Sequence, residues 1–481
     1  MRIAVLGGGF TGMTAAYYLA KKGHEVSLYE KEKVLGGLAV GFRQPNWDWY
    51  LERAYHHLLD SEDDILNFAR DLGFKDIFFK ETQTSSLYEI DRNAILGNGA
   101  TTESDTGQVG MIKQILNQVQ DDKTMKNIYR IFPLDSPQDL LNFPLLSLPE
   151  KIRAGIVLAF LKFSPFLNIY EKQTAADFLR KTQGEHVWEV LWQQLFRKKF
   201  GKYAEKILAT FIWARVTKRA KKLGYIKGGF QTFINHVKNE LDQLRVKVLT
   251  DYEVKTIEKR NEEFFVIRHP EFISGSDSKK QMLNQVQRDK IVKKKFDVII
   301  STLPTVIMSK ITQNIFPSLY LQKFSNLKYL HAVVMILETK EKILDKTYWL
   351  NVCTPKVPIM IVAQHTNFVD KKNYGGNHIA YVGWYIERKD PLIKMSAKEV
   401  LNYYLPHLHR VSSFKFHVSR FYKFVGPFAQ PIFDREFIKN KPAFKTPVKN
   451  FYIANLDMTY PYDRGTNYAV KLGREVSSLI K

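Results

Sequence analysis

The chain begins with a glycine-rich turn between two apolar runs, and this arrangement restricts what its N-terminus can fold into. Residues 2–6 (RIAVL) form a short apolar run typical of a buried parallel strand. Gly7, Gly9 and Gly12 follow with the spacing GxGxxG, and the next stretch, MTAAYYLAKKG, has helical character. A second strand is expected over residues 25–30 (EVSLYE), which end in an acidic residue. This order predicts a βαβ unit of the Rossmann type.

Each key position of this unit has a physical role. Gly7 permits the tight turn, Gly9 lets the backbone approach a pyrophosphate, and Gly12 lets helix and strand pack closely. The N-terminus of the helix stabilises phosphate charge. Glu30 lies 18 residues after Gly12, where a carboxylate accepts hydrogen bonds from ribose hydroxyls and repels a 2′-phosphate. We therefore expect an adenine dinucleotide other than NADP; the alternative is a chance glycine turn in another α/β protein.

A second glycine pair, Gly36-Gly37, follows Glu30 in the run YEKEKVLGGLA. The block over residues 2–38 resembles the flavin amine oxidase, protoporphyrinogen oxidase and phytoene desaturase superfamily. The resemblance implies that the second pair brings the backbone close to the pyrophosphate and ribityl portions of FAD. Simple NAD dehydrogenases lack this pair, so non-covalently bound FAD is the predicted cofactor. The residues of this block expected to bind it are Gly7, Gly9, Phe10, Thr11, Gly12, Glu30, Lys31, Gly36, Gly37 and Leu38.

The resemblance extends to the C-terminus. Residues 450–480 are expected to form a strand, a polar loop and a helix that begins near Thr466. In the superfamily the N-terminus of a comparable helix points at the flavin pyrimidine ring, where its positive end stabilises the anionic reduced flavin. A valine similar to Val254 meets the adenine end through its backbone. The resemblance thus implies that the later cofactor-binding residues are Val254, Asp457, Arg464, Gly465, Thr466 and Asn467.

The predicted fold class is α/β, with an FAD/NAD(P)-binding Rossmann-like domain of the amine-oxidase type and a discontinuous α+β substrate domain. In the superfamily a glycine pair similar to Gly228-Gly229 starts the return into the FAD domain. The expected FAD-binding domain comprises residues 1–77, 226–304 and 441–481, and the expected substrate domain comprises residues 78–225 and 305–440.

A short repeat interrupts this organisation. ILNQVQDDK (115–123) recurs as MLNQVQRDK (282–290), within polar stretches of about 97–127 and about 269–294. The two copies are too few and too irregular for a solenoid, and they resemble translated bacterial palindromic repeat elements. We predict that both stretches are surface insertions without catalytic function. Without them, the flanking sequences are expected to pair as strand hairpins.

The catalytic groups are less well defined. After the glycine pairs, the superfamily usually carries an acid, a glycine and often a histidine, whereas residues 41–59 contain Glu52, His56 and His57 without the glycine. His56, His57 and Tyr460 are the catalytic candidates, and ordinary packed side chains are the alternative. No general base is identified. No Ser/His/Asp triad, HExxH motif or P-loop occurs in the sequence, and no metal site is predicted.

Three functions remain open. The first is an FAD-dependent oxidoreductase that transfers a hydride from a substrate C–H bond to flavin N5. The second is a flavin-dependent sugar-nucleotide isomerase resembling UDP-galactopyranose mutase, which shares the GxGxxG start and a C-terminal YxY-like loop, here within TYPYDRGTNYA. In that enzyme basic residues hold the diphosphate, and the positive charge of this chain is compatible with such a role. The third is a flavin-binding scaffold without catalysis. All three involve a small molecule, and no nucleic-acid motif is present.

The net charge, the cysteine content and the apolar runs indicate which partners and which cellular compartment to expect. The formal net charge of +23 favours an anionic partner, although a merely basic surface is the simpler interpretation. The single cysteine, Cys353, permits no intrachain disulfide and suits a reducing cytoplasm. The longest apolar run, 152–167, contains Lys162 and Pro165. It predicts a core helix or, as the alternative, a helix in peripheral contact with the inner face of a membrane.

Overall fold

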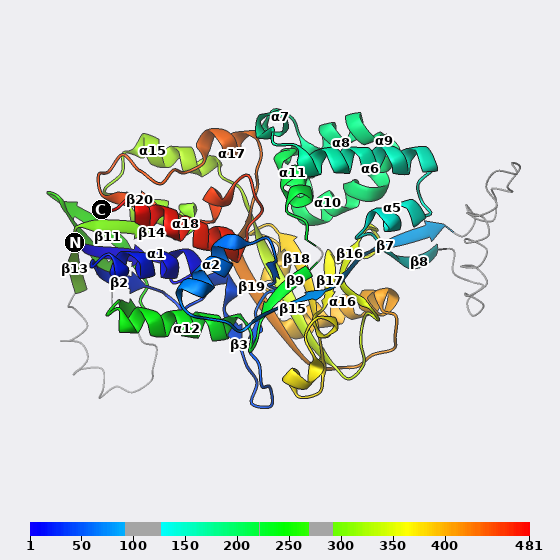
Figure 1. Ribbon diagram of the computed structural model, residues 1–481, viewed down its shortest axis with the longest axis horizontal. Coiled ribbons are helices and arrows are strands. Elements are labelled where there is room, and N and C mark those ends of the chain that lie inside the picture. The colour runs from blue at the N-terminus through cyan, green and yellow to red at the C-terminus, as the bar shows by residue number, and fades with distance from the viewer. Residues whose placement is uncertain (92–126, 221, 269–291) are drawn as a thin grey trace, which may run out of the picture. The chain divides into compact units, whose positions relative to one another are not determined.

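The computed structural model describes residues 1–91, 127–220, 222–268 and 292–481. They divide into two compact units, each assembled from segments that are distant in the sequence (Figure 1). Unit 1 comprises Met1–Phe79, Lys222–Tyr329 and Phe428–Lys481, and unit 2 comprises Lys80–Lys221 and Leu330–Pro427.

Unit 1 is built on a five-stranded parallel sheet in the order β10-β2-β1-β14-β20. The central strands are buried on both faces, which explains why their sequences are continuous apolar runs. The strands predicted over 2–6 and 25–30 are β1 and β2. The five strands are β1 (Arg2–Leu6), β2 (Glu25–Tyr29), β10 (Lys247–Leu249), β14 (Val298–Ser301) and β20 (Phe451–Ile453).

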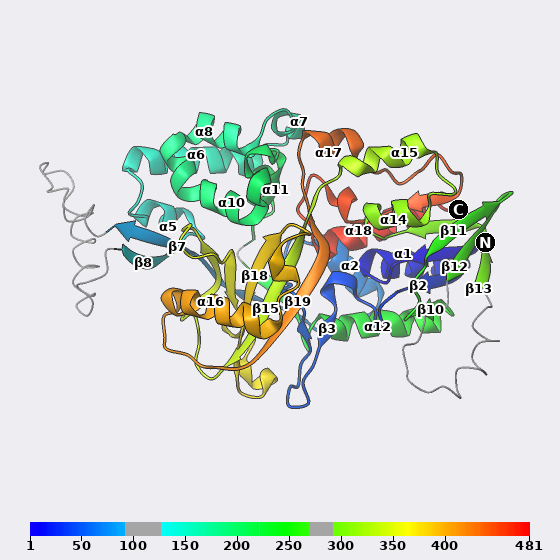
Figure 2. The ribbon, with the colours of Figure 1, turned by 180° about the vertical axis from the view of Figure 1, so that it is seen from behind.

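Helices cover one face of this sheet, and a three-stranded antiparallel sheet covers the other (Figure 2). The helical face carries α1 (Phe10–Lys21), α12 (Phe230–Gln243) and α18 (Thr466–Ser478). The antiparallel sheet consists of β11 (Thr256–Arg260), β12 (Glu263–Arg268) and β13 (Val292–Phe296). The other elements of unit 1 are β3 (Gly41–Phe42), β4 (Leu51–Glu52), β5 (Leu58–Leu59), β6 (Ile77–Glu81), β9 (Lys222–Ile226), α2 (Asp63–Asp71), α14 (Thr305–Ile311), α15 (Ser318–Lys323), α17 (Arg435–Asn440), η1 (Gly37–Ala39), η4 (Phe324–Asn326) and η8 (Leu456–Thr459).

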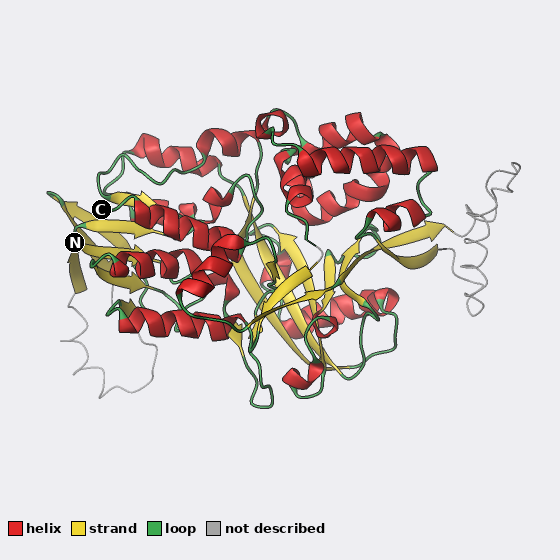
Figure 3. Cartoon of the chain, in the orientation of Figure 1, coloured by secondary structure: helices red, strands yellow, loops and turns green. Residues whose placement is uncertain are grey.

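Unit 2 contains a seven-stranded mixed sheet in the order β19-β15-β18-β17-β16-β7-β8 (Figure 3). Its strands are β7 (Gln83–Asp91), β8 (Asn127–Pro133), β15 (Tyr329–Thr339), β16 (Thr347–Val352), β17 (Ile361–Gln364), β18 (His378–Ile386) and β19 (Val418–Pro431). Helix α16 (Ala397–Val411) packs on one face through Val400, Leu401 and Leu408.

A layer of short helices covers part of the opposite face of the unit 2 sheet, where Tyr88 and Cys353 meet Phe143, Ala154 and Val187 in a common core. Its helices are α5 (Pro137–Asn142), α6 (Leu148–Phe163), α7 (Leu167–Glu171), α8 (Ala175–Gln183), α9 (Glu185–Val187), η2 (Trp188–Gln193), α10 (Gln194–Phe200), η3 (Gly201–Lys206) and α11 (Thr210–Thr217). Three further short helices complete unit 2: η5 (His365–Asn367), η6 (Lys371–Tyr374) and η7 (Pro391–Ile393).

Helix α6 begins four residues before the apolar run from which it was predicted. Ser147 and Glu150 form a capping box at its start, and Pro149 lies in its first turn. The helix ends at Phe163, two residues before Pro165. Among the described helices, none is both long enough and apolar enough to cross a bilayer.

The two repeat-bearing stretches lie outside the described residues except for their last positions. The strands that flank them are described, and they pair as predicted. Strand β7 is antiparallel to β8, with Asp91 opposite Asn127. Strand β12 is antiparallel to β13, with Arg268 opposite Val292. The predicted strand hairpins are therefore confirmed.

Candidate functional site

The first glycine turn, Glu30 and Asp457 lie at one edge of the parallel sheet in unit 1. Strands β2, β1, β14 and β20 all end at this edge because they run in the same direction. Strand β1 has β2 on one side and β14 on the other, so the strand order reverses between β1 and β14. Open α/β sheets bind their ligands at such a reversal, beyond the carboxyl ends of the strands.

The turn after β1 requires glycine. Gly7 has φ +107°, and its N–H donates to the Tyr29 carbonyl oxygen over 2.8 Å. A Cβ atom added at Gly12 would lie 1.9 Å from the carbonyl oxygen of Gly7. The hydroxyl of Thr302, just after β14, donates to the Leu6 carbonyl oxygen over 2.8 Å. The turn therefore packs directly against the start of α1 and the end of β14.

The N-terminus of α1 is suited to an anion. Its N-cap residue is Gly9, no described side chain caps it, and its first turn contains no acidic residue. A Cβ atom at Gly9 would have only the Cα of Gly37 within 4 Å, at 3.9 Å. The uncapped N–H groups and the positive end of the helix dipole therefore face a space beside Gly9 that a side chain at this position would fill. Phe10 and Thr11, also predicted as binding residues, are buried in this first turn.

Glu30 lies beside this turn at the end of β2. Its carboxylate is buried and accepts hydrogen bonds from the Gly8 N–H (2.7 Å) and the Glu32 N–H (2.9 Å). These bonds hold the carboxylate next to the glycine turn. Lys31 lies on the exposed side, where it pairs with Glu32 over 3.6 Å.

The second glycine pair packs on the first. The Gly36 N–H donates to the Gly8 carbonyl oxygen over 2.9 Å. A Cβ atom at Gly37 would lie 3.1 Å from the Cα of Gly9. Both glycines have positive φ, at +131° and +58°, and Leu38 follows on the exposed side. The tertiary structure therefore joins the two motifs, 24 residues apart between Gly12 and Gly36, into one backbone surface.

Asp457 occupies the β20 end of the same edge. One carboxylate oxygen, Oδ2, accepts hydrogen bonds from the Thr305 hydroxyl (2.5 Å) and the Tyr329 hydroxyl (2.7 Å). The other oxygen, Oδ1, is buried and has no hydrogen-bond partner among the described residues. Burial raises the pKa of Asp457, and the two hydroxyl hydrogen bonds oppose that rise. A polar ligand that donates a hydrogen bond would satisfy Oδ1.

Helix α18 begins at Thr466, as predicted, with Gly465 as its N-cap. No acidic residue lies in its first turn, and no described side chain caps it. Asn467 accepts a hydrogen bond from the Ile65 N–H over 3.0 Å, which fixes the helix against α2. The guanidinium of Arg464 donates to the Ala429 carbonyl oxygen over 2.7 Å. The unit thus presents a second helix N-terminus with no acidic side chain in its first turn.

Glu52 is completely buried and caps a different helix. Its carboxylate accepts from the Tyr225 hydroxyl (2.6 Å) and from the N–H of Phe230 (2.7 Å), the first residue of α12. Burial raises the pKa of Glu52 to about 7, although both hydrogen bonds act to lower it. The backbone of Gly229 packs against Tyr50, because a Cβ there would lie 2.3 Å from the Tyr50 carbonyl oxygen. Glu52 therefore holds strand β4 to α12.

The three catalytic candidates, His56, His57 and Tyr460, have different surroundings. His56 is half-buried, and its Nδ1 is 2.8 Å from the Ala54 carbonyl oxygen. Burial lowers the pKa of His56 to about 4; the bond to Ala54 opposes this change, and the charge of Arg464 adds to it. His57 is also half-buried. Tyr460 packs on Phe433 and Phe437, with ring centroids at 5.2 and 5.7 Å.

Val254 lies in the hydrophobic core beside Tyr29 and Tyr252, and the Tyr252 N–H donates to the Glu30 carbonyl oxygen over 2.9 Å. The described residues contain no group of three or more His, Cys, Asp or Glu side chains placed to hold a metal ion.

Sequence reasoning missed several contributors to this edge. Thr305 and Tyr329 bind Asp457, and no local motif marks either of them. Gly473 of α18 is a third example, because a Cβ there would lie 2.5 Å from the Thr11 carbonyl oxygen. A glycine inside a helical pattern signals such close packing, so this position was detectable. Through it α18 lies directly on α1 (Figure 1).

A protein-family model matches nearly the whole chain. The family model described as "Flavin containing amine oxidoreductase" matches residues 10–480. The 15-cis-phytoene desaturase of Synechococcus elongatus is 34% identical over 76 residues, which cover 16% of this chain and 16% of the desaturase. The chain thus matches about a sixth of the length of that curated relative.

Solved structures resemble the whole fold. Cyclohexylamine oxidase from Brevibacterium oxydans has a TM-score of 0.67 at 12% identity, covering 100% of this chain and 98% of that chain. Reduced UDP-galactopyranose mutase has a TM-score of 0.68 at 12% identity, covering 100% of this chain and 95% of that chain. At such low identity both show the fold alone.

The residues at the sheet edge fit a dinucleotide. The α1 N-terminus and the Gly9–Gly37 cradle suit its phosphates, and the unpaired Oδ1 of Asp457 suits a hydroxyl. Together with the family match, this fit confirms the predicted fold class, superfamily and FAD cofactor. The chain belongs to the flavin containing amine oxidoreductase family.

Proposed function

We propose that this protein is an FAD-dependent oxidoreductase acting on a small molecule, and that its FAD, when bound, would supply N5 as the acceptor for a hydride from a substrate C–H bond. The single observation that carries the proposal is the joining of the two glycine motifs, with Gly36 bonded to Gly8 and Gly37 packed on Gly9. This arrangement produces a bare backbone surface beside the α1 N-terminus, where a pyrophosphate is stabilised.

We assign the cofactor contacts along the sheet edge. The N–H groups at Gly9, Phe10, Thr11 and Gly12 would hold the pyrophosphate, and Glu30 would accept hydrogen bonds from the adenosine ribose. The backbone near Val254 would meet the adenine end. Further contacts to the first half of the cofactor are assigned to Lys31, Gly36, Gly37 and Leu38.

The opposite end of the edge would hold the flavin half. The free Oδ1 of Asp457 is placed to accept a hydrogen bond from the ribityl chain. The N-terminus of α18, with Arg464, Gly465, Thr466 and Asn467, would stabilise negative charge on the reduced ring. His56 is neutral at physiological pH, because its pKa is about 4, and it would add no charge of its own. We also propose that His56, His57 and Tyr460 contact the substrate.

We also propose a cellular location and a source for this protein. The only cysteine, Cys353, is buried in unit 2 and offers no intrachain disulfide. This supports a cytoplasmic enzyme, and the resemblance of the two repeat-bearing stretches to translated palindromic elements supports a bacterial source.

The purified full chain tests the proposal directly. It should be yellow, should release FAD on denaturation, and should lose its visible flavin bands when a suitable amine or other C–H donor is added without oxygen. A well-folded but colourless protein that takes up no added FAD would contradict it. Turnover that requires prior reduction and leaves the substrate unoxidised would instead favour a sugar-nucleotide isomerase.

A matched pair of variants locates the site. Glu30→Ala removes the buried carboxylate beside Gly8 and should weaken FAD binding by about tenfold or more. Glu32→Ala removes an exposed carboxylate two residues away, whose backbone N–H is retained, and should leave the FAD dissociation constant unchanged. Equal effects of the two substitutions would place the adenosine elsewhere.

A further inference from the structure

Large exposed apolar side chains are concentrated in one part of unit 2. Among the described residues, 17 large hydrophobic side chains are exposed, and eight of them lie between residues 141 and 169. These eight are Leu141, Leu148, Ile152, Ile156, Phe160, Phe163, Phe166 and Ile169. A contiguous apolar patch of this kind on a protein surface indicates a binding surface.

Helix α6 arranges five of the eight in a single row. Leu148, Ile152, Ile156, Phe160 and Phe163 follow one another at intervals of four, four, four and three residues. Such spacing places side chains on one face of a helix. Their exposed fractions range from 50% for Ile152 to 83% for Phe163. The row is therefore a solvent-facing stripe about four turns long.

Another side of α6 packs against the core of unit 2. Ala154 and Leu161 are fully buried, and Ala154 and Leu158 pack in the core with Phe143 and Val187. A helix on the surface of a globular protein ordinarily has a polar outer face. Helix α6 carries large apolar side chains both where it contacts its own core and in the exposed row, so the fold alone does not account for the exposed row.

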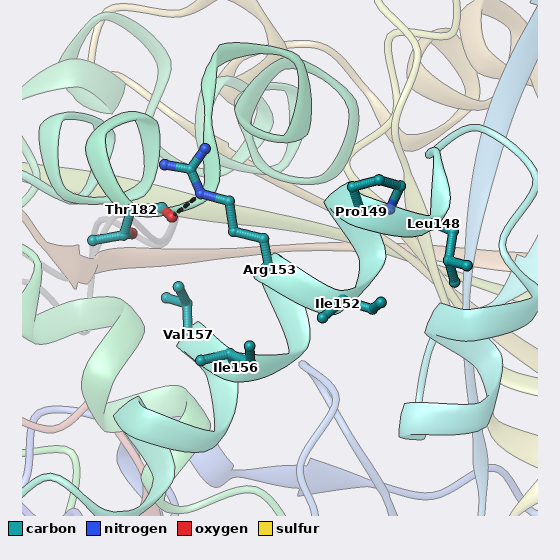
Figure 4. A pocket seen from close by; sticks show the side chains of 7 residues that line it. All are labelled: Leu148, Pro149, Ile152, Arg153, Ile156, Val157 and Thr182. Atoms are coloured by element: carbon teal, nitrogen blue, oxygen red, sulfur yellow. Dashed lines mark hydrogen bonds between the residues drawn. The ribbon is translucent and has the colours of Figure 1, made fainter.

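The stripe borders a surface pocket and continues past the end of the helix. A pocket of about 550 Å³ is lined by Leu148, Pro149, Ile152, Arg153, Ile156, Val157 and Thr182 (Figure 4). After Pro165, the exposed Phe166 and Ile169 extend the apolar surface onto α7. We call the stripe on α6 together with Phe166 and Ile169 the α6 face.

Two cations of the same helix accompany the α6 face, and both donate to main-chain oxygens. The Arg153 Nε donates to the Thr182 carbonyl oxygen over 2.6 Å, as Figure 4 shows. The Lys162 Nζ donates to the carbonyl oxygens of Thr217 (2.9 Å) and Arg219 (3.1 Å). Because carbonyl groups are uncharged, these bonds orient the two cations and leave their charge in place. The helical layer over residues 137–220 has 14 Lys and Arg against seven Asp and Glu, a formal excess of seven positive charges.

We propose that the α6 face docks this protein on an anionic lipid surface, with the apolar row in the acyl boundary and the cations at the headgroups. This combination of an apolar row with cations is what interfacial helices use. A second copy of the chain fits less well, because an isologous pairing would bring the same patch of each copy together and oppose like charges. The proposal is independent of the proposed function.

Vesicle co-sedimentation of the full-length holoprotein tests the docking surface. The protein should pellet with phosphatidylglycerol–phosphatidylcholine vesicles, and pure phosphatidylcholine vesicles should bind it several-fold more weakly. Raising the salt from 0.1 to 0.5 M should also weaken binding several-fold, because the Debye length shortens. The variant Ile156→Glu/Phe163→Glu should lower the partition coefficient by at least about tenfold.

The matched control is Leu319→Glu/Tyr403→Glu, which adds the same charge at exposed apolar positions outside the α6 face. It should bind vesicles within about twofold of the wild type, and thermal unfolding should show that both variants are folded. No pelleting of the wild type with anionic vesicles, or equal loss in both variants, would overturn the proposal. A concentration-dependent dimer that Ile156→Glu/Phe163→Glu dissociates, without vesicle binding, would assign the α6 face to a second copy instead.

Discussion

Two helices of this protein meet their surroundings in opposite ways. Helix α1 of unit 1 starts at a turn that requires glycine, and hydrogen bonds from Gly36 to Gly8 and from Gly8 to Glu30 hold that turn in place. Helix α6 of unit 2 carries large apolar side chains on a face that its own fold leaves exposed. A side chain added at Gly12 of α1 would collide with the backbone, whereas one added at Gly155 of α6 would meet no neighbour within 4 Å. A closely packed glycine backbone is therefore typical of the proposed FAD-binding edge of the sheet. An exposed apolar face is typical of a surface that binds a partner.

The largest expected effect comes from the same kind of substitution made in the two helices. Gly12→Val places a Cβ 1.9 Å from the Gly7 carbonyl oxygen and should abolish FAD binding or prevent folding. Gly155→Ala in α6 places a Cβ with no neighbour within 4 Å and should stabilise the protein by up to about 1 kcal/mol. Flavin-to-protein ratios and thermal unfolding measure both. Normal FAD content in Gly12→Val would show that α1 tolerates an added side chain as α6 does, and would contradict the prediction.

The next effect concerns Glu52, which is buried and has a pKa raised to about 7, from an ordinary value of 4.5. Between these values the unfolded chain has lost the proton that the folded protein keeps, so stability falls as the pH rises from about 4.5 to about 7. Glu52→Gln should remove this loss, which is at most about 3 kcal/mol. Urea unfolding at pH 5 and pH 8 checks it: the variant should gain at pH 8 relative to wild type. An unchanged pH dependence would show that Glu52 is ionised throughout.

A smaller effect is expected at His56, whose pKa of about 4 results first from burial and then from the charge of Arg464. Arg464→Gln should raise that pKa by less than about one unit, because burial remains. Imidazole NMR titration measures the shift. A rise to the ordinary value of 6.5 would show that charge, rather than burial, keeps His56 neutral.

The smallest effect, that of Ile156→Glu, is measured against a substitution on the buried side of the same helix. Ile156→Glu should change the free energy of unfolding by less than about 0.5 kcal/mol, because its side chain is exposed. Leu161→Glu, on the buried side of the same helix, should cost about 4 kcal/mol or more. Denaturant unfolding compares the two. A large loss in Ile156→Glu would mean that the outer stripe belongs to the core.

Local sequence was enough for the start of the cofactor edge. The strand β1, the glycine turn, α1 and β2 depend on neighbouring residues, so their spacing alone predicted them. Two distant strand pairs, β7–β8 and β12–β13, were also predictable, because each becomes a hairpin when its polar stretch is removed. The partners of Asp457 were not predictable, since Thr305 and Tyr329 are 152 and 128 residues away and carry no motif.

The sequence by itself determined the βαβ unit, because glycine spacing and a terminal acid impose steric and charge conditions that few folds meet. The family and the FAD cofactor followed from the resemblance of residues 2–38 to the superfamily, and the family match confirmed them. Only the tertiary structure decided which side of α6 faces outward. An apolar run is equally consistent with a core helix and an interfacial one, and burial depends on what packs against it. The structure likewise decided that Glu52 caps α12 and that Asp457 keeps one oxygen unpaired, because these are contacts between segments far apart in the chain.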